Sequence, residues 1–290
     1  MHVGGLRLNR VCFADPKTRT EVMNSNIISM EQHRSRKEVP IYLQVPGEIA
    51  DTGTRPFPAR ASDGNVYWCK RFINDHGRES TINEVVASEI GKRIGARVRE
   101  WAVIHVPDTF VGYRVGDSIR RYSLDGTPLF GSLDLEGAVL ETEPAAIHHV
   151  LDDSNHNEIP KLIALWALCN VQEDLQFLYD TNNDYEIWSI DHGFWFDSLP
   201  FPWQLSPVEQ LSGRIQVPRL TARIPAESWD KAIAVIDKLD NSLIDEICGK
   251  LPEEWEVTRA EIATLVNYAI GRIDYARDIL NSHKQAAGRR

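Results

Sequence analysis

Three charged residues in distant parts of the chain have types and spacings that suit phosphate and metal chemistry. Lys70 ends a run, Val-Tyr-Trp-Cys-Lys, with the residue types of a β-strand. Glu84 lies in the next stretch, which has helical spacing, and Asp191 directly follows a later strand-like run. A lysine can grip phosphate oxygens, a helix carboxylate can hold that lysine extended, and an aspartate can bind Mg²⁺. The sequence therefore offers parts for phosphoryl transfer in the order in which such a site would use them.

A turn before the lysine strand could complete such a site. Gly53-Thr54-Arg55 forms a turn whose backbone N–H groups could face phosphate oxygens. Each residue also has an ordinary explanation. Lys70 alone is typical of a solvated edge lysine, Glu84 of a helix surface, and Asp191 of a turn that ends at a glycine. It is their shared order along the chain that favours the functional interpretation.

The elements that must position these residues are predicted from periodicity and turn signals. Asp63-Gly64 is a hairpin signal, and Gly95 stands where a helix C-cap is needed. The first half is predicted to contain strands at residues 39–45, 57–61, 65–72 and 98–106 and a helix at residues 80–94. The second half is predicted to contain a helix from Pro160, a strand at residues 185–190, and helices at residues 227–249 and 258–282.

This order, with strands first and helices later, predicts an α+β fold with two lobes and a cleft between them. We expect a variable N-terminal extension at residues 1–40, a β-rich N-lobe at residues 41–130 and a mostly helical C-lobe at residues 131–290. The aromatic residues after Asp191 are expected to pack in the core behind a metal-binding loop; they are Phe194, Trp195, Phe196, Phe201 and Trp203.

Composition limits the classes of partner. The 290 residues carry a net charge of -10, which argues against broad nucleic-acid binding and against an anionic membrane surface. The four cysteines are scattered and form no zinc-ligand pattern. The longest apolar stretch, residues 162–169, is too short to span a bilayer, and the N-terminus lacks a signal-peptide pattern. A cytoplasmic location without membrane association is expected.

The run ASDGNVYWCK is followed by NEVVASEIGKRIG, so a strand lysine precedes a helix carrying Asn-Glu. This arrangement resembles the N-lobe of the HipA-like kinases and, more distantly, the phosphatidylinositol 3/4-kinase-like group. FGSLDLEGAV, LWALCN, DLQFLYD and IWSIDHGFWF resemble the hinge, catalytic loop and metal-binding loop of the HipA-like kinases. The resemblance covers roughly residues 45–200 and implies a two-lobed protein-kinase-like fold. It also implies phosphate contact by Lys70, an ion pair with Glu84 and Mg²⁺ binding by Asp191.

The catalytic loop can be aligned with the family in two ways. Anchoring on Asn170 places Gln172 at the position of the family's catalytic aspartate. Anchoring on Phe177-Leu178 instead makes Gln176 the amide ligand of the metal and Asp174 the catalytic carboxylate. We favour the second alignment, because residues two apart in an extended segment face the same side.

The resemblance implies an ATP- and Mg²⁺-dependent kinase whose acceptor is a Ser or Thr hydroxyl of a protein, with self-phosphorylation included. In this interpretation Asp174 and Lys70 are catalytic, Gly53, Thr54, Arg55, Lys70 and Glu84 bind the nucleotide, and Gln176 and Asp191 bind the metal. The alternative is a nucleotide-binding pseudokinase that acts as a protein-interaction module, which Gln172 in the aspartate position would favour. Lipid phosphorylation is a third and weaker alternative, because the chain is acidic and lacks a basic amphipathic helix.

Overall fold

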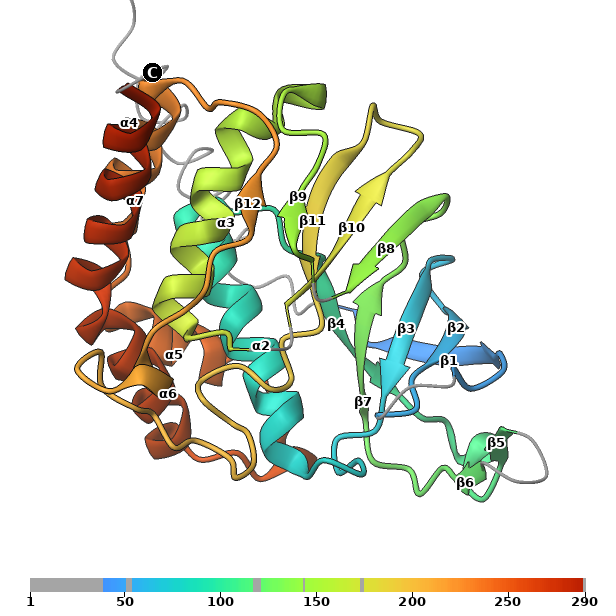
Figure 1. The fold of residues 1–290 in the computed structure, drawn as a ribbon. Coiled ribbons are helices and arrows are strands. Elements are labelled where there is room, and N and C mark those ends of the chain that lie inside the picture. The colour runs from blue at the N-terminus through green and yellow to red at the C-terminus, as the bar shows by residue number, and fades with distance from the viewer. Residues whose placement is uncertain (1–38, 51–53, 117–120, 143, 173–174, 289–290) are drawn as a thin grey trace, which may run out of the picture. The chain divides into compact units, whose positions relative to one another are not determined.

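The computed structural model describes residues 39–50, 54–116, 121–142, 144–172 and 175–288. The predicted extension at residues 1–40 therefore lies almost entirely outside the described residues. Within them, strands dominate the N-terminal half and helices the C-terminal half (Figure 1). The α+β class predicted from the sequence is confirmed, and the lobe boundary at residue 130 stays a prediction.

The first strands close into a barrel in the order β1-β2-β3-β7-β4. Its strands are β1 (Ile41–Pro46), β2 (Phe57–Ala61), β3 (Val66–Lys70), β4 (Trp101–His105) and β7 (Leu129–Leu133). β2 and β3 form the hairpin predicted from Asp63-Gly64, with Gly64 in the left-handed region at a φ of 88°. Alternation along β3 buries Tyr67 and Cys69 in a small barrel core. A short hairpin, β5 (Arg114–Gly116) with β6 (Arg121–Ser123), lies between β4 and β7 in the chain.

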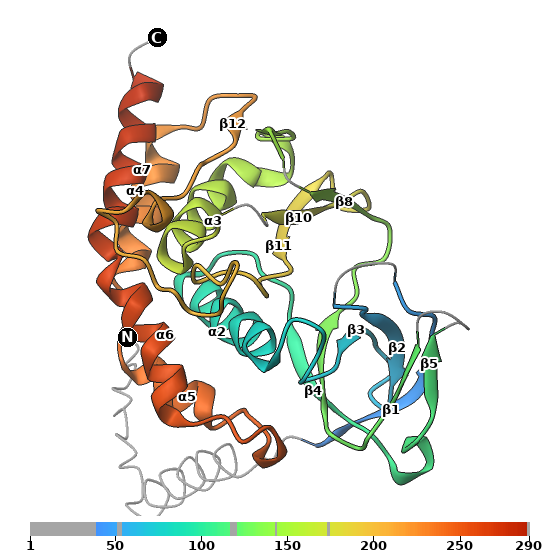
Figure 2. The ribbon, with the colours of Figure 1, turned by 60° about the horizontal axis from the view of Figure 1, so that its bottom comes forward.

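Helix α2 (Arg78–Ile94) connects β3 to β4 and belongs to a second, larger core. It ends as predicted at Gly95, whose φ of 69° is left-handed. Figure 2 shows α2 beside α3 (Asn155–Cys169), and α4 (Ala226–Ile236) and α7 (Ile273–Gly288) pack against α3. Because Val85, Val86 and Ile90 are buried among residues of these helices, the large core fixes the position of α2.

A second sheet, in the order β11-β10-β8, was predicted only in part. β11 (Glu186–Ile190) agrees with the predicted strand, whereas β8 (Ala138–Thr142) and β10 (Gln176–Asp180) were not predicted. The run DLQFLYD, which resembles the family's catalytic loop, is therefore a strand from residue 176 onward. Gln176 opens β10, where alternation buries Phe177 and Tyr179. A small parallel pair, β9 (Ala146–Ile147) with β12 (Arg219–Leu220), completes the strands of the described residues.

Three helix predictions need correction, because one helix starts earlier than predicted and two are divided. α3 begins at Asn155, not at Pro160, because the Asn155 side chain ties the helix start to two carbonyls: that of His149 in the preceding segment and that of Tyr185 in the β10–β11 turn. The helix predicted at residues 227–249 is divided into α4 and α5 (Ser242–Cys248), and Asp240 binds the Ser242 backbone N–H at the break. The last predicted helix is divided at Arg272, between α6 (Arg259–Gly271) and α7.

Candidate nucleotide and metal site

Lys70 is held at the end of β3 by pairing on both sides of the strand. β3 pairs with β2 and with β7, and Lys70 stands opposite Phe130. Because Cys69 points into the barrel core, its neighbour Lys70 points to the other face of the sheet. The lysine is nonetheless buried, with 7% of its surface exposed. A buried lysine needs anionic partners, and the structure supplies two.

Glu84 is the first partner and comes from the second turn of α2. It is 4% exposed, and its Oε1 binds Lys70 Nζ in a short ion pair. Its other oxygen, Oε2, accepts a hydrogen bond of 3.0 Å from the backbone N–H of His192. The two carboxylate oxygens of Glu84 therefore connect the β3 lysine to the segment that follows β11.

Asp191 is the second partner and stands directly after β11. Its Oδ1 lies 2.7 Å from Lys70 Nζ. Asp191 has a φ of 54°, in the left-handed region, so the chain leaves the extended conformation of β11 at this residue. Gln176 pairs with Ile190 in the β10–β11 ladder, and its Nε2 donates to Asp191 Oδ2 at 3.3 Å. The structure thus brings Lys70, Glu84, Asp191 and Gln176 together.

The electrostatics of this cluster follow from burial and from the single lysine shared by two carboxylates. Burial raises the pKa of Glu84 to about 7, and Lys70 offsets only part of that effect. Burial also opposes ionisation of Asp191, but its ion pair with Lys70 lowers the pKa of Asp191 overall. Burial lowers the pKa of Lys70, and the carboxylates of Asp191 and Glu84 outweigh this, so the net pKa of Lys70 is raised. Lys70 is therefore a permanent cation in this site.

Two buried residues that the sequence interpretation missed hold the loop after Asp191. Asn83 is fully buried, and its Nδ2 donates to the carbonyls of Gly193 at 2.8 Å and Trp195 at 3.1 Å. His192 lies between the hydroxyls of Ser88 and Ser189, and burial lowers its pKa to about 3, so the ring is neutral at pH 7. The one sequence signal for these roles was their position next to Glu84 and Asp191.

The predicted phosphate-binding turn is described in part. Gly53 lies outside the described residues. Arg55 Nε forms an ion pair of 3.1 Å with Asp75, and the Arg55 carbonyl accepts a hydrogen bond of 3.4 Å from the Tyr122 hydroxyl. These contacts of Arg55 are with the β3–α2 connection and β6, not with the Lys70 cluster. The nucleotide roles of Gly53, Thr54 and Arg55 stay predictions.

Asp174, the predicted catalytic carboxylate, also lies outside the described residues. Gln172, which the other alignment places at the catalytic position, forms hydrogen bonds within the protein. Its Nε2 donates to Asn170 Oδ1 at 2.8 Å and to the Ser212 carbonyl at 2.5 Å. Asn170 is fully buried and also binds the Arg272 guanidinium at 3.3 Å. This network gives Gln172 a role in packing the loop against the segment around Ser212.

The residues around Asp191 fit a hard divalent cation such as Mg²⁺, which prefers oxygen ligands. The Asp191 side chain is 32% exposed, so one face of its carboxylate remains open to solvent. Gln176 stands beside it with an amide, and rotation of that amide presents Oε1 in place of Nε2. Asp191 and Gln176 would hold the ion, which supplies positive charge to phosphate oxygens when it is bound.

The aromatic residues after Asp191 follow the prediction only in part. Trp195 and Phe196 are fully buried in the large core, as expected. Phe201 is 69% exposed, so its assignment to the core was wrong. The chain leaves the core at residues 199–202, where the connection runs over the surface and offers Phe201 no packing partner in the core.

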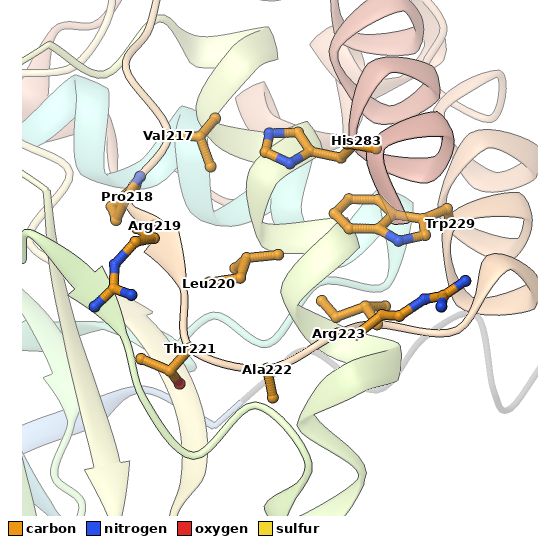
Figure 3. Close-up of a pocket in the computed structure, with 11 residues that line it drawn as sticks. Val217, Pro218, Arg219, Leu220, Thr221, Ala222, Arg223, Trp229 and His283 are labelled. Atoms are coloured by element: carbon orange, nitrogen blue, oxygen red, sulfur yellow. The ribbon is translucent and has the colours of Figure 1, made fainter. Parts of the chain in front are cut away.

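A separate pocket of about 440 Å³ lies in the C-terminal half (Figure 3). Residues 217–224 form one wall, and Trp229 and His283, from α4 and α7, form the other. The two rings stack nearly parallel with their centroids 5.3 Å apart. The pocket shares no residue with the Lys70 cluster, so the two are distinct features.

Among the described residues, no helix has the length and apolar character needed to cross a membrane.

Comparison with protein families gives a match at residues 43–159, to the model of the HipA-like kinases. The matched stretch includes Lys70 and Glu84 and ends before Gln176 and Asp191. The resemblance to HipA-like kinases is thus confirmed over this part of the chain. No curated protein matches the sequence.

Solved kinase structures are similar to the chain at low sequence identity. The proinflammatory kinase CtkA of Helicobacter pylori is 12% identical, with a TM-score of 0.48, and the alignment covers 81% of this chain and 94% of that one. The Golgi casein kinase is 9% identical, with a TM-score of 0.41 and coverage of 93% and 76%. Its complex with Mn/ADP is 10% identical, with a TM-score of 0.44 and coverage of 92% and 78%.

Proposed function

We propose that the chain is an ATP- and Mg²⁺-dependent kinase of the HipA-like type that phosphorylates a Ser or Thr hydroxyl of a protein, its own chain included. The observation that carries this proposal is the cluster in which Lys70 binds both Glu84 and Asp191. The three residues come from β3, α2 and the end of β11, so only the fold unites them. The family match over residues 43–159 supports the same function.

Each residue of the cluster has a distinct task in this proposal. Lys70 binds phosphate oxygens, because it is the buried cation that faces the metal-binding side chains. Glu84 keeps the lysine extended and, through the His192 N–H, fixes the start of the metal loop. Asp191 and Gln176 hold the ion. Asp174 accepts the proton of the attacking hydroxyl, as the alignment anchored on Phe177-Leu178 predicts.

Nucleotide binding is tested by thermal unfolding with and without Mg-ATP. At about 100 times its Kd, a ligand stabilises the folded protein by about 2.7 kcal/mol, which raises Tm by several degrees. We expect this rise in the wild type and its loss in Lys70→Ala and Asp191→Ala. Lys238→Ala and Asp278→Ala serve as controls, because both residues are exposed, Lys238 in the turn after α4 and Asp278 on α7. An equal rise in all five proteins would refute the site.

Transfer is tested by incubation with ATP labelled at the γ-phosphate. We expect label on the protein itself or on added protein, and its loss in Asp174→Asn. Full transfer by Asp174→Asn would refute the assignment of the proton acceptor. Mg-ATP stabilisation without any transfer would instead identify the chain as a nucleotide-binding pseudokinase.

A further inference from the structure

The first residue of α2 is joined to a helix from the far end of the chain. Arg78 Nη1 lies 2.5 Å from Glu261 Oε1, in the first turn of α6. Its second terminal nitrogen donates to the Glu256 carbonyl at 3.2 Å. The guanidinium therefore makes an ion pair with α6 and a hydrogen bond with the backbone of the segment that leads into it. A hydrogen bond from a charged donor such as this one is about twice as strong as a hydrogen bond between neutral groups.

Glu261 is itself fixed by the N-terminus of α6. Its Oε2 accepts a hydrogen bond of 2.8 Å from the Thr258 backbone N–H, and the Glu261 backbone N–H donates to Thr258 Oγ1 at 3.3 Å, so the two residues form a capping box. The Thr258 hydroxyl also donates to Glu261 Oε2 at 2.8 Å. Burial opposes ionisation of Glu261, but the hydrogen bonds from Arg78 and Thr258 lower its pKa overall. One carboxylate thus binds the starts of two helices, α2 and α6, to each other.

Trp255, in the 3₁₀ turn Glu253–Trp255, anchors the same segment to the strands that flank Lys70. It is 1% exposed, and its ring stacks on Phe72 with the centroids 4.8 Å apart and the planes 6° apart. Its Nε1 donates to the Pro128 carbonyl at 2.8 Å. Phe72 lies two residues beyond Lys70, and Pro128 directly precedes β7, the strand that pairs with Lys70.

We infer that Arg78, Glu261 and Trp255 form a positioning clamp that aligns Lys70 with Glu84 from outside the site. The inference rests on the proposed function, since it names what holds the catalytic lysine and its partner in register. Arg78 fixes the helix that carries Glu84, and Trp255 fixes the two strands around Lys70. Both contacts come from residues 253–261, which lie outside the stretch that matches the HipA-like family model.

The opposite end of α2 provides a matched control. Arg93, in its last turn, lies 2.6 Å from Glu246 in α5, so a second ion pair also joins α2 to the C-terminal helices. The Arg93 side chain is 19% exposed, close to the 28% of Arg78. Its hydrogen bonds go to Asp240, Ser242 and Glu246, and none of these three residues belongs to the clamp. Loss of Arg93 removes two ion pairs, with Asp240 and Glu246, from the same helix and leaves the clamp intact.

The test compares Arg78→Ala, Glu261→Gln and Arg93→Ala in the full chain. Glutamine keeps an acceptor for the capping box, so Glu261→Gln removes chiefly the charge that Arg78 binds. Two quantities are measured: amide hydrogen exchange of residues 79–88, and the Kd of the Mg complex of a non-hydrolysable ATP analogue. We expect exchange about tenfold faster and binding about tenfold weaker in Arg78→Ala and Glu261→Gln, and a Kd changed less than about twofold in Arg93→Ala.

The double variant and a conservative variant sharpen the result. Arg78→Ala combined with Glu261→Gln should be no worse than either single change, because both remove one interaction. Arg78→Lys, which keeps the charge, should recover part of the affinity. Three outcomes would each overturn the clamp. They are an equal change of the Kd in Arg78→Ala and Arg93→Ala, a change in the double variant equal to the sum of the two single changes, and a Kd in Arg78→Lys as weak as in Arg78→Ala. If the wild type and Lys70→Ala bind the analogue equally, the proposed function fails, and exchange at residues 79–88 alone decides whether the clamp holds α2.

Discussion

The barrel and the helical half of the chain bury their apolar residues in two separate cores of unequal size. The barrel core is small and includes Phe57, Cys69 and Ile104. The large core spans α2 to α7 and two strands of the second sheet, β10 and β11. Lys70 belongs to a strand of the small core, whereas Glu84 and Asp191 belong to elements of the large one. The candidate site therefore lies where two packing units meet, and its geometry depends on both.

Two strands connect these cores. In β7, Leu129 packs in the barrel core and its neighbour Phe130 in the large core. In β4, Ile104 is buried in the barrel core, and Trp101 and Val103 pack against the large core. Because the same strands serve both cores, we expect the cores to unfold together.

The largest expected effects come from a cavity in each core. Phe57→Ala in the barrel and Phe177→Ala in the large core both truncate a fully buried ring. Each should lower the free energy of unfolding by about 4 kcal/mol, through lost burial and the cavity left behind. Urea unfolding followed by tryptophan fluorescence should show one transition for both variants. An early, separate transition in Phe57→Ala alone would show that the barrel unfolds independently, and Leu211→Ala, at an 83% exposed residue, is the neutral control.

Removal of the charge that joins the two cores comes next in size. Lys70→Met leaves Glu84 buried without its cation and should lower the free energy of unfolding by about 3 kcal/mol at pH 8. Burial raises the pKa of Glu84 to about 7, so at pH 5 the carboxyl is neutral and the cost of losing Lys70 should be smaller. Urea unfolding at the two pH values checks this. An equal cost at pH 5 and pH 8 would contradict it, and Lys284→Met, from an exposed pair with Asp230, should change little at either pH.

The smallest effect concerns His192, on the large-core side of the site. Burial lowers its pKa to about 3, below that of a histidine in the unfolded chain, so the neutral ring contributes stability that is present above about pH 6.5. This contribution is lost as the pH falls from about 6.5 towards 3, and the loss amounts to about 2 kcal/mol by pH 5. In His192→Asn the acid-side loss of stability should be shallower by that amount. His76→Asn, at an exposed position, provides the comparison slope. If the free energy of unfolding of His192→Asn falls with pH as steeply as that of the wild type, the acid sensitivity belongs to other groups.

Local patterns in the sequence sufficed for the elements that carry Lys70, Glu84 and Asp191. β3 has consecutive strand-forming residues and a hairpin signal before it, and α2 has an apolar stripe and a terminal glycine. Their order along the chain matches the order in the HipA-like kinases, and this match led us to predict that the three residues form one phosphate and metal site. The structure joins them with direct contacts.

What the sequence did not reveal depends on pairing between distant segments. β10 was missed because its identity as a strand rests on pairing with neighbours on both sides, β8 and β11. Asn83 was missed because an asparagine within a helix gives no sign of the carbonyls it will meet in the loop after Asp191. The break between α6 and α7 at Arg272 was not predicted, because it depends on a contact that helical periodicity does not encode. The Arg272 guanidinium is buried and donates to the Ala167 carbonyl of α3.

The left-handed backbone at Asp191 restricts which amino acids position 191 can hold. Short polar side chains and glycine accept such a φ, whereas β-branched or bulky residues adopt it only with strain of about 1–3 kcal/mol. Variation at this position is thereby limited by main-chain geometry as well as by chemistry. Asparagine keeps both shape and conformational preference, so it is the exchange that isolates the contribution of the negative charge.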